Sequence, residues 1–269
     1  MTSDDELQAR TIANFGEQWT SYSDTSGFFG SADLFNDFFN PLLSATDVAG
    51  CRIAEIGAGT GRFVNVFAKA GASHIVALEP SDAFRVLRET TSAFRDRIDY
   101  LNVAGDLLPA SGDLDYVFAI GVLHHIPDPK PVLSAAYKAL KPGGSMAAWI
   151  YGREGNGLYL ALARPMWWLR RRLSQQGLDL FVRLLYPFFW IYMTVSRVLP
   201  LPLSAYMCRV MLPLTPDKRR LVIYDQLNPA FAKYYTRDEA RVLLASAGFT
   251  DIRMHHRHGM SWTVVGRRP

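Results

Sequence analysis

Cysteine is scarce in this chain, and its scarcity excludes two kinds of site. The 269 residues include only two cysteines, Cys51 and Cys208. Two thiols cannot build a disulfide framework or a cysteine-rich zinc site. So few cysteines are typical of a protein from a reducing compartment.

The beginning of the chain also lacks the apolar stretch of a secretion signal. Residues 1–6 are acidic instead, so no signal peptide is predicted. Apolar residues make up 49% of the chain and charged residues 20%. A packed core can therefore form, wholesale disorder is excluded, and we expect a folded cytoplasmic protein.

Acids and lysine are nearly absent from one long apolar segment. Residues 158–215 contain seven arginines, one acid (Asp179) and no lysine or glutamate, so this segment carries +6 while the whole chain carries +4. The arginines stand among Trp-Trp, Phe-Phe-Trp and leucine-rich runs, whereas nucleic-acid-binding segments more often combine basic residues with polar ones. We therefore expect no nucleic-acid partner.

Three glycines at alternate positions form the most informative motif that is present. Gly57, Gly59 and Gly61 follow an apolar run, which predicts a buried strand, and precede a stretch with helical periodicity. Glycine lets the backbone approach a ligand closely, and the helix that follows points unpaired N–H groups at the turn. A dinucleotide-binding fingerprint would place the last glycine one residue later. The turn predicts a nucleotide-like ligand of another kind.

Strand-like and helix-like runs alternate along the chain, which favours a parallel sheet flanked by helices. Strands are predicted at 52–56, 74–79, 98–103, 114–120, 144–150, 250–257 and 260–266, and helices at 61–70, 81–95 and 129–140. Residues 141–144, Lys-Pro-Gly-Gly, predict a turn into the fifth strand. Thr236 and Glu239 have the spacing of a capping box, which predicts a helix from there to Gly248.

Acidic residues stand near the ends of the first three predicted strands. Glu79 follows Gly61 by eighteen residues and ends the second strand, where a carboxylate could accept both hydroxyls of a ribose. Asp106 follows the third strand, within reach of an adenine amino group. Glu55 precedes the glycine turn and either orients it or contacts the ligand.

These motifs, in this order, resemble the class I S-adenosylmethionine-dependent methyltransferases, in the small-molecule branch that includes quinone-biosynthesis enzymes. The matching stretches are EIGAGTGRF, ALEPS, GDLLPASGDLDYVFAIGVLHHI, LKPGG and YYTRDEARVLLASAGF. The resemblance implies an α/β, Rossmann-like fold with seven strands, mostly parallel, whose last strand inserts antiparallel beside the sixth. It also implies S-adenosylmethionine as cofactor and S-adenosylhomocysteine as product.

The resemblance assigns a cofactor site to Glu55, Gly57, Ala58, Gly59, Gly61, Glu79, Pro80, Asp106, Ile120 and Gly121. In that assignment Glu79 binds the ribose, Asp106 lies near the adenine, and the backbone of Ile120 and Gly121 holds the methionine end. His124 and His125 follow the fourth strand, where the acceptor pocket of the family opens. Either could be a general base; the alternative is a structural turn with one histidine bonded to the backbone.

Two segments lie outside the methyltransferase core, which we place at 51–151 and 235–269, and they supply most of the predicted acceptor site. An N-terminal helical and aromatic segment, 1–50, covers either the cofactor or only the sheet, and an insertion at 152–234 forms a helical lid. The predicted acceptor-binding residues are Trp19, Tyr22, Tyr224, Asp225, Asn228, Tyr235 and His256. No metal site is predicted, because strand alternation separates His255 from His256 and His258.

The insertion is also the segment of the chain that could contact a membrane. Prolines are expected to cut its apolar stretch into short helices, and the longest apolar run, 184–196, has thirteen residues where a spanning helix needs about twenty. It is therefore not expected to span. A substrate cap, a membrane-surface contact through 158–215, and a core or homodimer interface all stay open.

The sequence predicts methylation, by preference on oxygen, of a hydrophobic or lipid-linked small molecule. Nucleic-acid methylation is not expected, because neither an Asp/Asn-Pro-Pro-Tyr/Phe motif nor a Pro-Cys pair is present. The alternatives are carbon methylation of a quinone-like or natural-product acceptor and a non-catalytic cofactor-binding accessory protein. We expect a cytoplasmic location, with peripheral contact at the inner face of the membrane.

Overall fold

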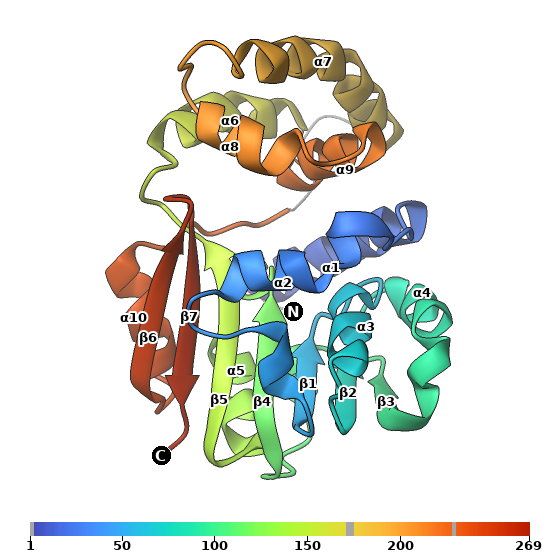
Figure 1. The fold of residues 1–269 in the computed structure, drawn as a ribbon, viewed down its shortest axis with the longest axis vertical. Helices are drawn as coiled ribbons and strands as arrows, with labels where there is room; N and C mark the ends of the chain where they lie inside the picture. Colours follow the sequence, from blue (N-terminus) through green and yellow to red (C-terminus); the bar gives the residue numbers. More distant parts are fainter. Residues whose placement is uncertain (1–2, 171–174, 228–229) are drawn as a thin grey trace. The chain divides into compact units, whose positions relative to one another are not determined.

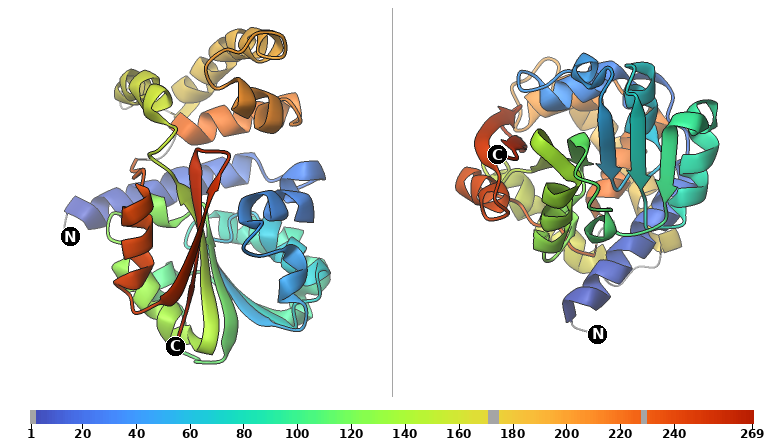
Figure 2. Two further views of the ribbon diagram at one scale, coloured as in Figure 1. Left: turned by 60° about the vertical axis from the view of Figure 1, so that its left-hand side comes forward. Right: turned by 90° about the horizontal axis from the view of Figure 1, so that it is seen from below.

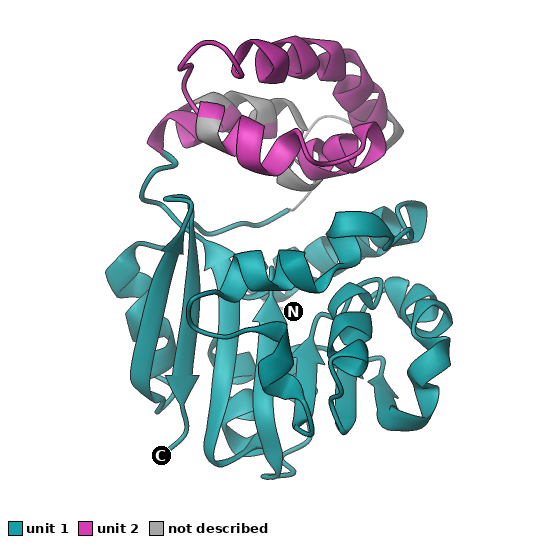
Figure 3. Ribbon diagram, in the orientation of Figure 1, with its two compact units in different colours: residues 1–156, 230–269 teal, residues 157–229 magenta. Residues whose placement is uncertain are grey.

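The computed structural model describes residues 3–170, 175–227 and 230–269 (Figure 1). It divides into two compact units (Figure 3). Unit 1 comprises residues 1–156 and 230–269, and unit 2 comprises residues 157–229. Unit 2 lies inside the predicted insertion 152–234.

Unit 1 is built on one seven-stranded sheet. Its strands are β1 (Arg52–Ile56), β2 (His74–Leu78), β3 (Ile98–Leu101), β4 (Leu114–Ile120), β5 (Leu140–Tyr151), β6 (Thr250–Arg257) and β7 (Ser261–Arg267). Their order is β3-β2-β1-β4-β5-β7-β6. β7 pairs antiparallel with β5 and with β6, and the other neighbours are parallel. The predicted mostly parallel sheet, with its last strand inserted antiparallel, is confirmed.

Six α-helices belong to the described part of unit 1 (Figures 1 and 2). They are α1 (Ser3–Ser21), α2 (Ala32–Phe39), α3 (Arg62–Lys69), α4 (Ala83–Thr90), α5 (Lys130–Ala139) and α10 (Arg237–Ala245). Short 3₁₀ turns lie at η1 (Gly27–Gly30), η2 (Ala45–Val48), η3 (Ser92–Arg97), η4 (Gly105–Leu107) and η5 (Leu123–His125).

Alternating residues of the central strands bury both faces of the sheet. On β4, Val117 belongs to the core that α5 and α10 help to form on one face. Its neighbour Phe118 points the other way, where its ring packs on Phe35 of α2 and Phe67 of α3. Side chains of a strand alternate between faces, so covering both faces requires the continuous apolar run that the sequence shows here.

The predicted capping box begins α10. The Thr236 hydroxyl accepts from the Glu239 backbone N–H at 3.2 Å, and the Glu239 carboxylate accepts from the Thr236 N–H at 2.8 Å. Two of the four unpaired N–H groups at the helix start are thereby satisfied. The helix ends at Ala245, three residues before the predicted end.

Two further predicted boundaries differ from the structure by more than two residues. The helix expected at 81–95 ends at Thr90, where the Thr91 hydroxyl donates to the Leu87 carbonyl and the chain continues as η3. The turn expected at 141–144 lies inside β5, which already pairs at Leu140 and then shifts register before Ser145. Gly143 has φ +82° and its N–H donates to the Arg268 carbonyl, so this irregular stretch is tied to the end of β7.

Unit 2 is helical. It contains α6 (Gly157–Arg170), α7 (Gln175–Val195), α8 (Ser204–Tyr206), a π turn (η6, Met207–Met211) and α9 (Pro216–Leu227). Buried side chains of α7, η6 and α9 form a separate core, which includes Leu178, Val182, Met193, Met207, Met211, Ile223 and Tyr224.

The expectation that prolines cut the apolar stretch into short pieces is wrong for α7. This helix runs for 21 residues and contains Pro187 in its interior. The pyrrolidine ring lies on the exposed side of the helix, so the loss of one backbone hydrogen bond is tolerated without burying an unpaired group.

The length argument against a membrane span fails for the same reason. Within the described residues, one stretch, Gly177–Val195, is long and apolar enough to cross a membrane. Core helices of soluble proteins pass the same test, so length and composition alone decide nothing about a membrane.

Candidate active site

Four connections at the carboxyl ends of the parallel strands carry the predicted site. They are the glycine turn 57–61 after β1, residues 79–81 after β2, Gly105–Asp106 after β3 and 121–125 after β4 (Figure 1). In open parallel sheets the carboxyl ends of the strands form one edge, and ligands bind there. All four connections belong to unit 1.

The glycine turn has left-handed backbone angles at every glycine. φ is +70° at Gly57, +56° at Gly59 and +78° at Gly61. A Cβ on Gly57 would lie 2.6 Å from Val122 Cγ2, and one on Gly61 would lie 2.6 Å from Thr91 Cγ2. Packing therefore requires glycine at these two positions.

Gly59 differs, because a Cβ there would come no closer than 3.7 Å to its nearest neighbour, the Trp19 indole. Only its backbone angle requires glycine, and the space beside it is lined by an aromatic ring from α1.

Glu79 is buried and holds this turn through three hydrogen bonds. Its Oε2 accepts from the Gly59 N–H at 2.8 Å, and its Oε1 accepts from the Ser81 N–H at 3.0 Å and from the Ser81 hydroxyl. A carboxylate offers about four lone-pair positions, so one remains for a further donor. The predicted ribose contact stays a prediction, and the structure adds a positioning contact to Gly59.

Glu55 is the most perturbed carboxyl group of the site. It is 2% exposed, and burial raises its pKa to about 8, with the Glu79 charge adding to the rise and Arg62 opposing it. Among the described residues its Oε2 has no hydrogen-bond partner. A buried oxygen left without a partner is costly, and a cationic group of a ligand would relieve that cost.

The remaining predicted cofactor residues lie along the same edge. Ala58 is buried and its N–H donates to the Leu78 carbonyl at 2.8 Å, while Pro80 is half-buried in the next connection. Gly105 packs so closely on Ile56 that a Cβ would lie 2.4 Å away, and Asp106 beside it is exposed. Ile120 ends β4, and Gly121 adopts φ +80° with its N–H donating to the Trp149 carbonyl.

Helix α1 packs on three of these connections. A Cβ on Gly16 would lie 3.1 Å from Ser81 Cβ, Trp19 lies beside Gly59, and the Phe15 ring meets His125 edge-on at 4.8 Å. Tyr22 follows α1 and is half-buried. The spacing Phe15–Trp19 places both rings on one face of the helix, which is how one helix reaches separate strand ends.

The two histidines after β4 are both buried but have different partners. His125 Nδ1 lies 2.9 Å from the carbonyl oxygen of Phe231. Burial lowers its pKa to about 4, with that hydrogen bond opposing the change. Because a carbonyl only accepts, Nδ1 carries the proton of the neutral ring and Nε2 keeps the lone pair.

His124 is fully buried, and its ring lies 3.8 Å from that of Tyr151. Within the described residues neither of its ring nitrogens has a hydrogen-bond partner. Burial, with the neighbouring His125, holds its pKa well below the ordinary value, so the ring is neutral. His125 is therefore the better placed of the two for proton transfer.

The predicted acceptor residues are distributed over both units. In unit 1 the Tyr235 side chain is 3% exposed and belongs to the apolar core, and burial raises its pKa to about 12. His256 stacks on Trp262 with ring centroids 4.1 Å apart. In unit 2 Tyr224 is part of the core and Asp225 lies on α9. Asn228 lies outside the described residues.

Two partners of the histidines escaped the sequence analysis. Phe231 acts through its backbone carbonyl, which no side-chain pattern reveals, and it is 106 residues from His125. Tyr151 stands at the end of β5, where an aromatic residue is read as core. The spacing of Phe15 and Trp19 in the sequence is a signal from which the α1 contacts could have been predicted.

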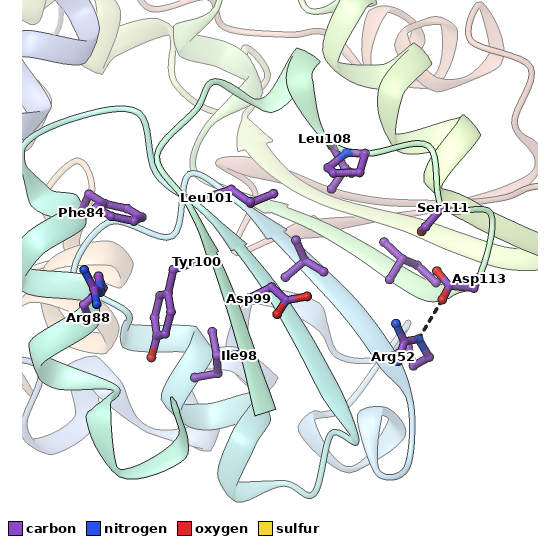
Figure 4. A pocket seen from close by; sticks show the side chains of 13 residues that line it. Arg52, Phe84, Arg88, Ile98, Asp99, Tyr100, Leu101, Leu108, Ser111 and Asp113 are labelled. Atoms are coloured by element: carbon purple, nitrogen blue, oxygen red, sulfur yellow. Dashed lines mark hydrogen bonds and ion pairs between the residues drawn. The ribbon is translucent and has the colours of Figure 1, made fainter. Parts of the chain in front are cut away.

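A separate surface pocket of about 540 Å³ lies elsewhere on unit 1 (Figure 4). Residues at the amino ends of β1, β3 and β4 help to line it, including Arg52, Ile98 and Leu114, and Arg52 is paired there with Asp113 at 3.0 Å. No predicted site residue lines this pocket. In residues 3–170, 175–227 and 230–269, no cluster of three histidine, cysteine or acidic side chains could hold a metal ion.

Comparison with known proteins identifies the same segment of the chain. Residues 54–146 match the family model described as a methyltransferase domain. These residues include the glycine turn, Glu79, Asp106 and both histidines. Residues 54–146 thus form a methyltransferase domain, and the chain resembles the class I S-adenosylmethionine-dependent methyltransferases.

Similar curated proteins include the ubiquinone biosynthesis O-methyltransferase of Methylococcus capsulatus, 25% identical over 169 residues, which are 62% of this chain and 71% of that protein. The enzyme of the same name from Idiomarina loihiensis is 33% identical over 141 residues, 50% of this chain and 57% of that protein. The chain thus spans between about half and seven-tenths of the length of these relatives.

Solved methyltransferases share the fold at low identity. The 1,6-didemethyltoxoflavin-N1-methyltransferase of Burkholderia thailandensis, bound to S-adenosylhomocysteine, has a TM-score of 0.56 and 14% identity, covering 99% of this chain and 91% of that one. Human N-acetylserotonin methyltransferase, in complex with S-adenosylmethionine, has a TM-score of 0.54 and 15% identity, covering 100% and 60%. Both of these structures contain S-adenosylmethionine or its demethylated product, S-adenosylhomocysteine.

Proposed function

We propose that the protein transfers a methyl group from S-adenosylmethionine to an oxygen atom of a hydrophobic or lipid-linked small molecule. One observation carries this proposal: the Phe231 carbonyl fixes the tautomer of His125, so that a neutral imidazole keeps its Nε2 lone pair at the predicted acceptor site. A hydroxyl nucleophile must lose its proton, and such a nitrogen can accept it. The names of the curated relatives also support an oxygen acceptor.

The residues of the site fit the proposed cofactor. The turn 57–61 offers left-handed glycines, and Gly59 leaves the space of a missing Cβ facing Trp19. Glu55 holds a buried oxygen without a described partner, which suits the ammonium group at the methionine end. We propose that Glu79 and Asp106 receive the ribose and the adenine, and that the backbone of Ile120 and Gly121 holds the methionine end.

In the proposed mechanism the protein contributes mainly position. When bound, the cofactor supplies an electrophilic methyl group on its sulfonium. Transfer is an in-line displacement, so the glycine turn and the aromatic residues of α1 hold the reacting atoms in line and exclude water. We propose that Trp19 and Tyr22 of unit 1 contact the acceptor, with Tyr235 and His256 of the same unit as further contacts. His125 takes the hydroxyl proton at Nε2, and the ring of His124 packs against the ring of His125.

His125→Asn tests the role of this nitrogen. The Asn amide can donate to the Phe231 carbonyl as Nδ1 does, but it offers nothing in place of Nε2. We expect kcat to fall about a hundredfold or more, with cofactor affinity unchanged. Turnover is followed by mass spectrometry with deuterated methyl donor, using the first acceptor that this assay finds in a lipid extract of the source cell.

The matched control is His255→Asn on β6, the same chemical change at a half-buried histidine outside the site. It should keep full activity. Unchanged kcat in His125→Asn would remove the general base and favour carbon methylation without His125. Cofactor binding with no labelled product from any extract would indicate a non-catalytic accessory protein.

A further inference from the structure

Exposed large apolar side chains concentrate on one segment of unit 2. In the described part of the chain eleven such side chains are exposed, and seven of them lie between residues 180 and 199. We call these seven the α7 patch: Leu180, Leu184, Phe188, Trp190, Ile191, Val198 and Leu199. A concentration of this kind marks an interaction surface, whereas single exposed apolar residues need no explanation.

The α7 patch is an outer face and not a displaced core. Leu180, Leu184 and Phe188 follow one another at four-residue spacing along α7 and are 58–71% exposed. The opposite face of the same helix is already packed, because Leu178 and Met193 are 0% exposed in the core of unit 2. Only 17% of the apolar window Gly177–Val195 is buried, which is unlike the core helix of a soluble protein.

The charges around the α7 patch are positive. Arg183, Arg197 and Arg209 are exposed, and the one acid of residues 158–215, Asp179, is paired with Arg183 at 2.8 Å. Trp190 is 50% exposed, and an indole with one apolar and one polar side suits the headgroup region of a membrane. Apolar side chains flanked by arginine and tryptophan complement an anionic lipid surface.

We propose that unit 2 docks on anionic membrane surfaces through the α7 patch, with α7 lying in the plane of the interface. A crossing helix would have to give up the contacts of Leu178, Val182 and Met193 with the rest of the unit 2 core. It would also carry the Asp179–Arg183 pair toward the hydrocarbon. A second copy of the chain is a poorer occupant, because two arginine-flanked patches would face each other with like charge.

Flotation of the full-length protein with vesicles tests the docking without any need for turnover. One set of vesicles contains phosphatidylcholine alone, and the other contains phosphatidylcholine with phosphatidylglycerol. We expect the protein to float with the anionic vesicles, to bind the neutral ones at least tenfold more weakly, and to be released by high salt. Docking and methyl transfer are measured separately, so failure of one leaves the other standing.

Two pairs of matched variants locate the contact. Leu184→Ser with Phe188→Ser should weaken binding at least tenfold, whereas Val242→Ser, equally exposed on α10 of unit 1, should not change it. Arg197→Gln with Arg209→Gln should remove the preference for anionic vesicles, and Arg95→Gln, exposed on unit 1, should leave it intact.

Quenching of tryptophan fluorescence by brominated lipids shows whether α7 lies in the interface or crosses the bilayer. The Trp190→Phe variant gives the signal of the other tryptophans, which is subtracted. Quenching near the headgroups supports the proposal, and quenching at the bilayer centre overturns it. Absence of flotation overturns it too. A dimer in sedimentation velocity that the Leu184 and Phe188 substitutions dissociate, without vesicle binding, would assign the α7 patch to a subunit interface instead.

Discussion

At the scale of single residues, Glu55 makes the sharpest link between structure and cofactor. Its raised pKa of about 8 keeps it protonated at neutral pH in the absence of a ligand. A cationic ammonium group against its free Oε2 would favour the carboxylate and expel the proton. We therefore expect cofactor binding at pH 7 to release close to one proton, measured by calorimetry in buffers of different ionisation enthalpy.

The Glu55→Gln variant should release none, and its affinity should lose the increase with pH that the unchanged protein shows up to about pH 8. Glu89→Gln, on the exposed side of α4, is the control and should behave like the unchanged protein. If Glu55 only orients the turn, both proteins bind without releasing a proton.

At the scale of elements, the turn between β1 and α3 contains a glycine that packing requires, Gly57, and one whose open side can face a ligand, Gly59. Gly57→Ala would force a Cβ to 2.6 Å from Val122 Cγ2, so we expect a marked fall in melting temperature. Gly59→Ala meets nothing closer than 3.7 Å and bears only the strain of a left-handed angle, about 1–2 kcal/mol. It should fold and yet lose affinity for S-adenosylmethionine in calorimetry.

The double change of Gly57→Ala with Val122→Ala should recover part of the melting temperature, because it removes the clash. Gly59→Ala binding the cofactor as tightly as the unchanged protein would place the ligand away from this glycine.

The same elements show what could be predicted from the sequence. β1 and β4 are buried on both faces, so their apolar runs and the glycines after them identified strands and turn together. The capping box at Thr236 is local and was equally readable. The continuation of α7 through Pro187 was not, because the exposure of that proline is set by the tertiary packing of unit 2.

The candidate site also has parts that could be predicted from the sequence and parts that could not. Gly57, Glu79 and Asp106 are side chains or glycines at strand ends, and their spacing carried the prediction. The bond from His125 to Phe231 joins residues 106 positions apart through a backbone carbonyl, which every residue type possesses. Long-range contacts of this kind depend on the path of the chain and leave no mark on composition or periodicity.

At the scale of the whole molecule, the two units need not unfold in one transition, so stability is best followed on unit 1 alone. Its buried ionisable groups have opposite effects on how the free energy of unfolding changes with pH. Glu55 has a raised pKa, so its contribution is complete below about pH 4.5 and is lost as the pH rises to about 8. His125 has a lowered pKa, so its contribution is complete above about pH 6.5 and is lost as the pH falls toward 4, with His124 acting in the same direction.

Below pH 6.5, protonation of the two histidines lowers the free energy of unfolding more than protonation of Glu55 raises it. Above pH 6.5, only the ionisation of Glu55 still lowers the free energy of unfolding. We therefore expect unit 1 to be most stable between about pH 6 and 7, with each group changing the free energy by at most about 1.4 kcal/mol per pH unit. Amide hydrogen exchange of β1 and β4 measures this stability. Glu55→Gln should flatten the decline above pH 6.5, and His125→Asn should make the decline below it shallower. Exchange protection that stays constant from pH 6.5 to 8 would show that Glu55 is not buried as a protonated acid.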